Sequence, residues 1–174
     1  WKCHACTQLL IMKIFMENNL FYRDIEKLIL MIKGKKVVFT NGCFDLLHYG
    51  HIALLNYSKK LGDVLVVGLN SDKSVKSIKG NSRPIYNENM RAEMLLSLKS
   101  VDYVIIFDTD TPVKLIEKIK PSILVKGSDY KREEIVGAET VKKYNGEIVI
   151  FDRISNISTS NIIQTIKNTE NTHD

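Results

Sequence analysis

The chain has 174 residues, of which 44% are hydrophobic and 26% charged, and its formal net charge is +5. This length is enough for one domain with a sizeable core, and the composition excludes disordered, collagen-like and disulfide-scaffold proteins. Lysines and arginines are scattered, with no long basic block and no basic stretch interleaved with aromatic residues. We therefore expect a phosphorylated small molecule, and not nucleic acid, as the partner.

The cysteines and the apolar runs bear on localisation. Three cysteines cannot all pair, which favours a reducing cytoplasm. The apolar run 28–32 is far shorter than the roughly 20 residues that cross a bilayer, so we expect no membrane span. Cys3 and Cys6 form one C-x-x-C without a second pair of ligands, so we expect no zinc site there. We interpret residues 1–20 as an N-terminal extension, for which disorder is one option, and residues 21–174 as the single domain.

Helical and strand patterns alternate along the remaining chain. Apolar spacing predicts a helix at 24–32, a strand at 36–39, a helix at 52–61, a strand at 64–68 and a helix at 90–98. It then predicts a strand at 103–107, a helix capped by Thr111 and begun by Pro112, strands at 123–126 and 147–151 on either side of a helix at 139–144, and a last helix opened by Ser158.

Five strands alternating with helices predict a doubly wound, Rossmann-like α/β domain: a five-stranded parallel sheet with helices on both faces. In such sheets the ligand lies beyond the carboxyl ends of the strands, where the strand order reverses. This point commonly lies between the first strand and the fourth.

Polar residues follow the first predicted strand, in the segment 40–51, which ends at the start of a helix. This segment contains the motif H-x-G-H, formed by His48, Gly50 and His51. Two imidazoles at a helix N-terminus can donate hydrogen bonds to a polyphosphate, and the glycine lets the backbone approach. Fixed donors of this kind stabilise the charge that develops in phosphoryl transfer. The alternative is a pair of surface histidines that bracket a turn.

Other catalytic patterns lack support. The sequence has no G-x-x-x-x-G-K-[ST] loop and no G-x-G-x-x-G, which removes the main support for P-loop kinases and dinucleotide-binding enzymes. No G-x-S-x-G follows a strand, and we interpret Cys43 as a small packing residue and not as a nucleophile.

The segment 40–51 resembles the signature of the nucleotidyltransferase superfamily that shares H-x-G-H. Four more segments, at 68–72, 79–85, 110–112 and 124–130, resemble one branch of it, the bacterial D-glycero-β-D-manno-heptose 1-phosphate adenylyltransferases. Members of that branch occur alone or as the C-terminal domain of a bifunctional heptose kinase and adenylyltransferase. The resemblance covers residues 24–167.

The resemblance implies a reaction in which a heptose 1-phosphate oxygen attacks the α-phosphorus of ATP in line. The products are ADP-heptose and pyrophosphate, and the activated sugar serves a cell-surface glycan such as lipopolysaccharide core. Mg²⁺ would bridge phosphate oxygens, and no covalent enzyme intermediate is expected. We expect a homodimer, and a separate sugar kinase upstream, because this chain shows no kinase domain.

The resemblance also implies roles for individual residues. The expected catalytic residues are His48, His51 and Lys79. The expected nucleotide-binding residues are Thr40, Asn41, Gly42, Cys43, Phe44, Gly50, Asn70, Asp72, Lys126, Gly127, Asp129, Ser158, Thr159 and Ser160, and Tyr130 would lie beside them. Lys76, Arg83, Arg91 and Arg153 are expected to bind substrate phosphate, and Asp45 to touch the magnesium ion.

Several of these roles have plainer alternatives. Lys76 can be a solvated lysine, and Arg91 can make only a surface ion pair. Asp45 more readily orients its own loop than binds a metal. The segment 158–160, expected to receive the β- and γ-phosphates, can be an ordinary helix cap, and the two roles are compatible.

Two other functions stay open. Arg153 precedes the segment 157–160 in the spacing R-x-x-x-I-S-T-S, which also resembles cytidylyltransferases that act with CTP on glycerol 3-phosphate or on another phosphorylated alcohol or sugar. The heptose-like segments 79–85 and 124–130 favour ATP. The last alternative is a nucleotide-binding module without catalysis.

Overall fold

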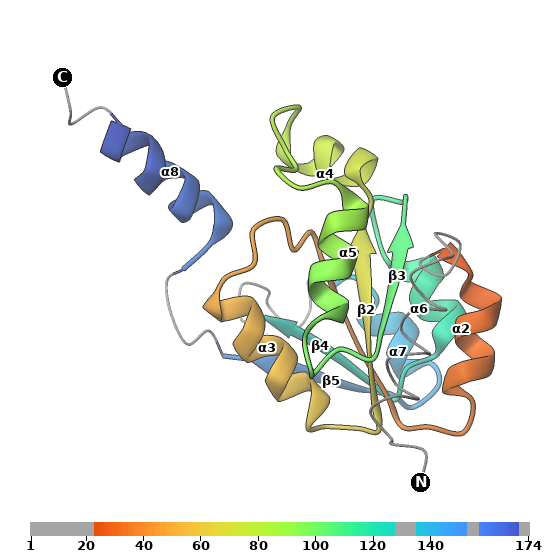
Figure 1. Cartoon of the computed structure of the whole chain (residues 1–174). Coiled ribbons are helices and arrows are strands. Elements are labelled where there is room, and N and C mark those ends of the chain that lie inside the picture. Colours follow the sequence, from red (N-terminus) through yellow and green to blue (C-terminus); the bar gives the residue numbers. More distant parts are fainter. Residues whose placement is uncertain (1–22, 128–134, 153–156, 171–174) are drawn as a thin grey trace, which may run out of the picture.

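The computed structural model describes residues 23–127, 135–152 and 157–170 (Figure 1). Its helices are α2 (Ile25–Ile32), α3 (Tyr49–Lys59), α4 (Asp72–Lys79), α5 (Glu88–Leu96), α6 (Val113–Ile119), α7 (Ala138–Lys142) and α8 (Thr159–Glu170). Its strands are β1 (Val37–Gly42), β2 (Val64–Asn70), β3 (Tyr103–Phe107), β4 (Ile123–Gly127) and β5 (Glu147–Phe151). The expected extension at residues 1–20 lies outside the described residues.

The five strands form one parallel sheet in the order β3-β2-β1-β4-β5. Helices α3 and α5 cover one face, and α2, α6 and α7 cover the other (Figure 1). The predicted doubly wound fold is therefore confirmed, and the strand order reverses between β1 and β4. None of the described helices has the length and apolar character that crossing a membrane requires.

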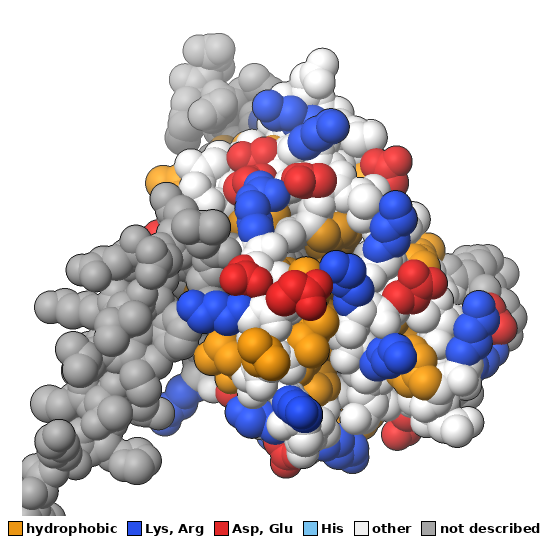
Figure 2. Space-filling model, turned by 90° about the vertical axis from the view of Figure 1, so that its right-hand side faces the viewer, with side chains coloured by type: hydrophobic (Ala, Val, Ile, Leu, Met, Phe, Trp, Pro, Cys, Tyr) orange, Lys and Arg blue, Asp and Glu red, His pale blue; other side chains and the backbone are white. Residues whose placement is uncertain are grey.

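The outer surface of the layer that contains α2 and α6 carries acidic and basic side chains side by side (Figure 2). One example is the ion pair between Lys118 of α6 and Glu26 of α2, at 3.2 Å. Both side chains are largely exposed, so this pair contributes little to stability.

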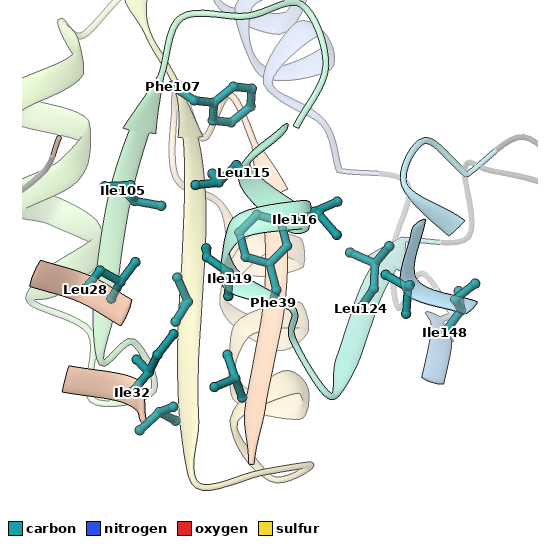
Figure 3. Packing of buried hydrophobic residues seen from close by; sticks show 14 of the residues in the cluster. Leu28, Ile32, Phe39, Ile105, Phe107, Leu115, Ile116, Ile119, Leu124 and Ile148 are labelled. Carbon is teal, nitrogen blue, oxygen red and sulfur yellow. The ribbon is translucent and has the colours of Figure 1, made fainter. Parts of the chain in front are cut away.

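The strands are mostly apolar because helices bury both faces of the sheet. All seven residues of β2 are buried, for example. On the face covered by α2, α6 and α7, Phe39 of β1 lies among Ile116 and Ile119 of α6 and Leu124 of β4 (Figure 3). Full burial of such a side chain stabilises the fold by about 1.5–3 kcal/mol. This core fixes the sheet whose carboxyl edge carries the polar residues.

The structure shifts some predicted boundaries. Strand β1 continues to Gly42, and α3 begins at Tyr49, so more of the segment 40–51 is regular structure than predicted. The prediction that Thr111 caps α6 was wrong: Pro112 is the N-cap, and its carbonyl accepts from Ile116 N at 2.9 Å. Helix α4 was not predicted, since its eight residues are mostly polar.

Strands β1 and β4 are joined along only part of their length. Their paired residues are Val38 with Ile123 and Phe39 with Leu124, whereas β1 pairs with β2 through six residues. No further pairing joins β1 to β4, although β1 continues to Gly42 and β4 to Gly127. This incomplete pairing, which we call the seam, leaves room for a crevice at the carboxyl edge of the sheet.

Candidate functional site

A cavity of about 320 Å³ lies at the carboxyl ends of β1, β2 and β4, at the seam. This is where the fold predicts a ligand site. The residues that line it are Asn41, Gly42, Cys43, Phe44, Asp45, His51, Asn70, Ile78, Lys79, Arg83, Asp110, Thr111, Pro112, Lys126, Val136 and Thr159.

The H-x-G-H motif forms the first turn of α3. His48 is the N-cap residue, and its carbonyl accepts from His51 N at 2.9 Å and from Ile52 N at 3.2 Å. The imidazoles of His48 and His51 stack, with their ring centroids 3.8 Å apart. A Cβ at Gly50 would lie 3.1 Å from Cε1 and Nδ1 of His48. The glycine therefore gives the His48 ring the space that it occupies beside the helix end.

The two histidines have different positions relative to the cavity. His51 lines it, whereas His48 does not and stacks behind His51. Phe44 packs near His51, with ring centroids 5.0 Å apart. A Cβ at Gly42 would lie 3.1 Å from Cε2 of Phe44, so this position also favours a glycine. His51 is thus the imidazole placed to meet a ligand in the cavity.

Asp45 anchors the loop between α4 and α5. Its side chain is 1% exposed, and its Oδ2 accepts from Arg83 Nε at 2.5 Å. Its Oδ1 accepts from the backbone N–H groups of Ile85, at 2.7 Å, and Tyr86, at 3.2 Å. Because both oxygens accept from protein donors, this geometry favours the loop-orienting role. The magnesium contact stays a prediction.

Arg91 of α5 is fully buried. It donates to the backbone carbonyls of Cys43 at 2.6 Å, Asn70 at 2.8 Å and Tyr86 at 2.9 Å, and to Oδ1 of Asp72 at 2.8 Å. The alternative that Arg91 makes only a surface ion pair is therefore wrong, because its guanidinium lies in the interior. These contacts favour a positioning role, and the phosphate contact stays a prediction.

Lys126 links β4 to β1 where their backbones are no longer paired. Its Nζ donates to Oδ1 of Asn41 at 2.5 Å, and both residues line the cavity. Burial penalises the charged ammonium group and lowers the pKa of Lys126 to about 8. The seam thus holds a buried cationic group beside the ligand site.

Two further cations meet the cavity from α4 and the loop that follows it. Lys79, in the last turn of α4, lines the cavity, whereas Lys76 is exposed and is not among the lining residues. Arg83 also lines the cavity, and its buried Nη2 has no hydrogen-bond partner among the described residues. Burial raises the pKa of the nearby Cys43 thiol, which supports its interpretation as a packing residue.

The N-terminus of α8 closes another side of the site. Thr159 lines the cavity, and its Oγ1 donates to the carbonyl of Leu46 at 3.3 Å. Ser158 Oγ accepts from Asn161 N at 3.1 Å, which confirms the predicted helix cap. Ser160 is exposed and is not among the lining residues.

The structure brings most of the expected site residues together. Those that line the cavity are Asn41, Gly42, Cys43, Phe44, Asp45, His51, Asn70, Lys79, Arg83, Lys126 and Thr159. Those placed elsewhere are Thr40, His48, Gly50, Asp72, Lys76, Arg91, Gly127, Ser158 and Ser160. Asp129, Tyr130 and Arg153 lie outside the described residues.

Five lining residues were not among the expected site residues. Three of them, Asp110, Thr111 and Pro112, follow β3, and their position after the carboxyl end of a strand could have predicted that they line the site. Ile78 and Val136 gave no such signal, because exposed apolar side chains are common on protein surfaces and do not by themselves indicate a site.

Comparison with known proteins gives a family match and close relatives. The family model described as cytidylyltransferase-like matches residues 39–165. Two proteins named bifunctional protein HldE are each 52% identical to the chain. The match to the protein of Helicobacter pylori covers 84% of this chain and 31% of the relative, and that of Syntrophotalea carbinolica covers 77% and 27%. The chain thus spans about a third or less of the length of these relatives.

Solved structures agree with the fold. A lipopolysaccharide core biosynthesis protein from Thermoplasma volcanium is 36% identical, with a TM-score of 0.55, over 72% of this chain and 100% of that chain. A pantothenate synthetase from Thermus thermophilus is 14% identical, with a TM-score of 0.60, over 84% of this chain and 69% of that chain. At this identity the second likeness concerns the fold alone.

Proposed function

Since the chain belongs to the cytidylyltransferase-like family, we propose that it transfers the adenylyl group of ATP to a heptose 1-phosphate, giving ADP-heptose and pyrophosphate. The observation that carries the proposal is the cavity at the seam, where His51, Lys79 and Arg83 surround one space of about 320 Å³. The identity to the HldE proteins and to a lipopolysaccharide core biosynthesis protein supports a heptose as the acceptor and lipopolysaccharide core as the destination.

The reaction needs positioning and charge stabilisation more than proton transfer. A phosphate monoester with a second pKa near 6 is mostly ionised at pH 7, so its oxygen needs no general base to attack the α-phosphorus. As the new O–P bond forms, the bond to the leaving pyrophosphate breaks, and negative charge grows on the leaving oxygens. Donors that are already in place stabilise this charge at no reorganisation cost.

The described residues supply such donors from three directions. His51 stands at the N-terminus of α3, where the helix dipole favours an anion. Thr159 stands at the N-terminus of α8, and we assign this end to the β- and γ-phosphates. Lys79 and Arg83 lie on the segment after β2, and we assign them to the α-phosphate and the acceptor phosphate.

Magnesium enters this scheme with ATP, as part of the substrate. The described residues contain no group of three or more His, Cys, Asp or Glu side chains that could hold a metal ion. A cavity with few carboxylates suits Mg²⁺ held mainly by phosphate oxygens and water, and Asp110 is a carboxylate that lines it. The ion would neutralise phosphate charge.

The setting of the reaction follows from the same proposal. An upstream sugar kinase would supply the 1-phosphate, the reaction would take place in the cytoplasm, and the chain would act as a homodimer. Neither nucleic acid nor a membrane is required as a partner.

The test is pyrophosphate release by the purified chain with Mg²⁺ and heptose 1-phosphate, with ATP, CTP, GTP and UTP supplied separately. We expect turnover with ATP alone. Turnover confined to CTP would replace the proposal with a cytidylyltransferase. Binding of ATP without turnover on any phosphorylated sugar or alcohol would reduce it to a binding module.

A further inference from the structure

Arg83 is a buried cation whose hydrogen bonding is incomplete. Its side chain is 11% exposed, and its Nε donates to Asp45. The buried Nη2 has no partner among the described residues. Buried polar groups in folded proteins are nearly always hydrogen-bonded, so this edge of the guanidinium calls for an acceptor beyond those that the described residues supply. The cavity that Arg83 lines is where that acceptor would bind.

We propose that Asp45 is a positioning residue that acts through Arg83, holding the guanidinium so that its free edge meets a phosphate group in the cavity. This inference rests on the proposed function, because it presumes that a phosphate binds there. An arginine that uses Nε for a carboxylate keeps its two terminal nitrogens, and their paired N–H groups match two oxygens of one phosphate.

The second oxygen of Asp45 fixes the backbone that carries Arg83. Oδ1 accepts from the N–H groups of Ile85 and Tyr86, two and three residues after the arginine. Arg91 holds the same peptide segment as well, since its Nε donates to the carbonyl of Tyr86 at 2.9 Å. Side chain and loop are therefore fixed by one carboxylate, which is itself buried beside the H-x-G-H turn.

Positioning and simple electrostatics predict opposite changes in anion affinity when Asp45 is replaced. Removing a negative charge beside Arg83 would, by Coulomb attraction alone, strengthen the binding of an anion. If Asp45 positions Arg83, its replacement weakens anion binding, because the guanidinium no longer faces the cavity in a fixed orientation. Asp45→Asn suits the test, since its amide oxygen can still accept from Ile85 and Tyr86 while the Arg83 ion pair is lost.

The experiment is a double-mutant cycle on the full chain, made of Asp45→Asn, Arg83→Gln and the pair combined. Calorimetric titration measures the affinity for inorganic phosphate, which resembles the acceptor, and for pyrophosphate, which resembles the triphosphate end. For at least one of the two anions, we expect each single variant to bind about tenfold more weakly than the original chain does. The double variant should then bind no more weakly than Arg83→Gln alone.

Additive losses in the cycle would mean that Asp45 does not act through Arg83, and unchanged or tighter binding by Asp45→Asn would refute positioning altogether. Asp110→Asn is the matched control, because it removes a carboxylate that lines the same cavity, whereas the described ion pair of Arg83 is with Asp45. We expect it to leave phosphate and pyrophosphate affinity unchanged or raised. Melting curves of all variants show whether a loss reflects unfolding.

These readouts separate the inference from the proposed function. Anion binding is measured without turnover, so a coupled cycle in a chain that transfers no nucleotide would overturn the function and leave the positioning role intact. Normal ATP-dependent turnover together with an additive cycle would overturn the positioning role alone.

Discussion

The two imidazoles of the H-x-G-H turn stack on each other, but only His51 lines the cavity. His48 is the N-cap residue of α3 and lies against Gly50. At the scale of single residues, the motif thus consists of one imidazole that lines the cavity and one that packs against it. The spacing of the motif serves both, since it places one ring behind the other at a helix end that favours anions.

His51→Ala should lower turnover by about 10²–10³-fold, because it removes a fixed donor from the charge that develops in the transition state. The melting temperature should stay close to that of the original chain, since the ring is only partly buried. Steady-state pyrophosphate release and a thermal melt check both points. Asn56→Ala, on the exposed face of the same helix, is the control and should change neither. Near-normal turnover by folded His51→Ala would remove His51 from the mechanism.

The sequence was informative about residues that act locally and uninformative about contacts between distant segments. The H-x-G-H turn lies within one short segment, so its place at a helix start could be predicted. The bond between Asp45 and Arg83 joins residues 38 positions apart, and the bonds from Arg91 reach 48 positions back to Cys43. Such pairings depend on how the loops fold over the sheet, and local spacing carries no record of that.

At the scale of elements, Arg91 ties α5 to four other parts of the fold. Its acceptors lie after β1, at the end of β2 and in the loop before α5, and its ion-pair partner Asp72 begins α4. A buried guanidinium that satisfies several carbonyls is costly to remove, because each acceptor is left without its donor.

Arg91→Met should therefore destabilise the domain by about 3–5 kcal/mol. Urea denaturation of the purified chain measures the free energy of unfolding. Lys118→Met is the matched control: it removes the same kind of charge from an exposed ion pair on α6, and its effect should be about 0–1 kcal/mol. Equal effects of the two substitutions would mean that the Arg91 contacts do not support the fold.

Elements with a clear apolar pattern were predicted well. Strands β3 and β5 have the predicted bounds, since each is a short apolar run between polar residues. Helix α4 was missed, because Val75 and Ile78 are its sole apolar residues. Its start depends on Ser71, whose side chain accepts from Ser74 N, and a lone serine predicts a cap only when a helix is already expected.

At the scale of the whole molecule, the charge of Lys126 links stability to pH. Its pKa is about 8 in the folded chain, below the ordinary 10.5, because burial penalises the ammonium form. Between these values the unfolded chain binds the proton and the folded chain does not, so stability rises with pH across this window. Below pH 8 both states are protonated, and burial of the charge is a cost.

Unfolding of the original chain and of Lys126→Met should thus be compared from pH 7 to pH 10. We expect the stability of the original chain relative to the variant to rise above pH 8, by up to roughly 3 kcal/mol. Taking the difference cancels other titrating groups, including Tyr144, whose pKa burial raises to about 12. A difference that stays constant with pH would show that the Lys126 ammonium is not destabilised by the fold.

The seam has a consequence for how the molecule assembles. Strands β1 to β3 come from residues 37–107, and β4 and β5 come from residues 123–151. The sheet therefore consists of two contiguous blocks of sequence whose shared edge is short. A nucleotide bound across that edge contacts both blocks at once, so it stabilises only molecules in which the two are docked. Ligand binding therefore favours the fully folded chain, and a chain that ends before β4 keeps three of the five strands but lacks the side of the cavity formed by Lys126, Val136 and Thr159.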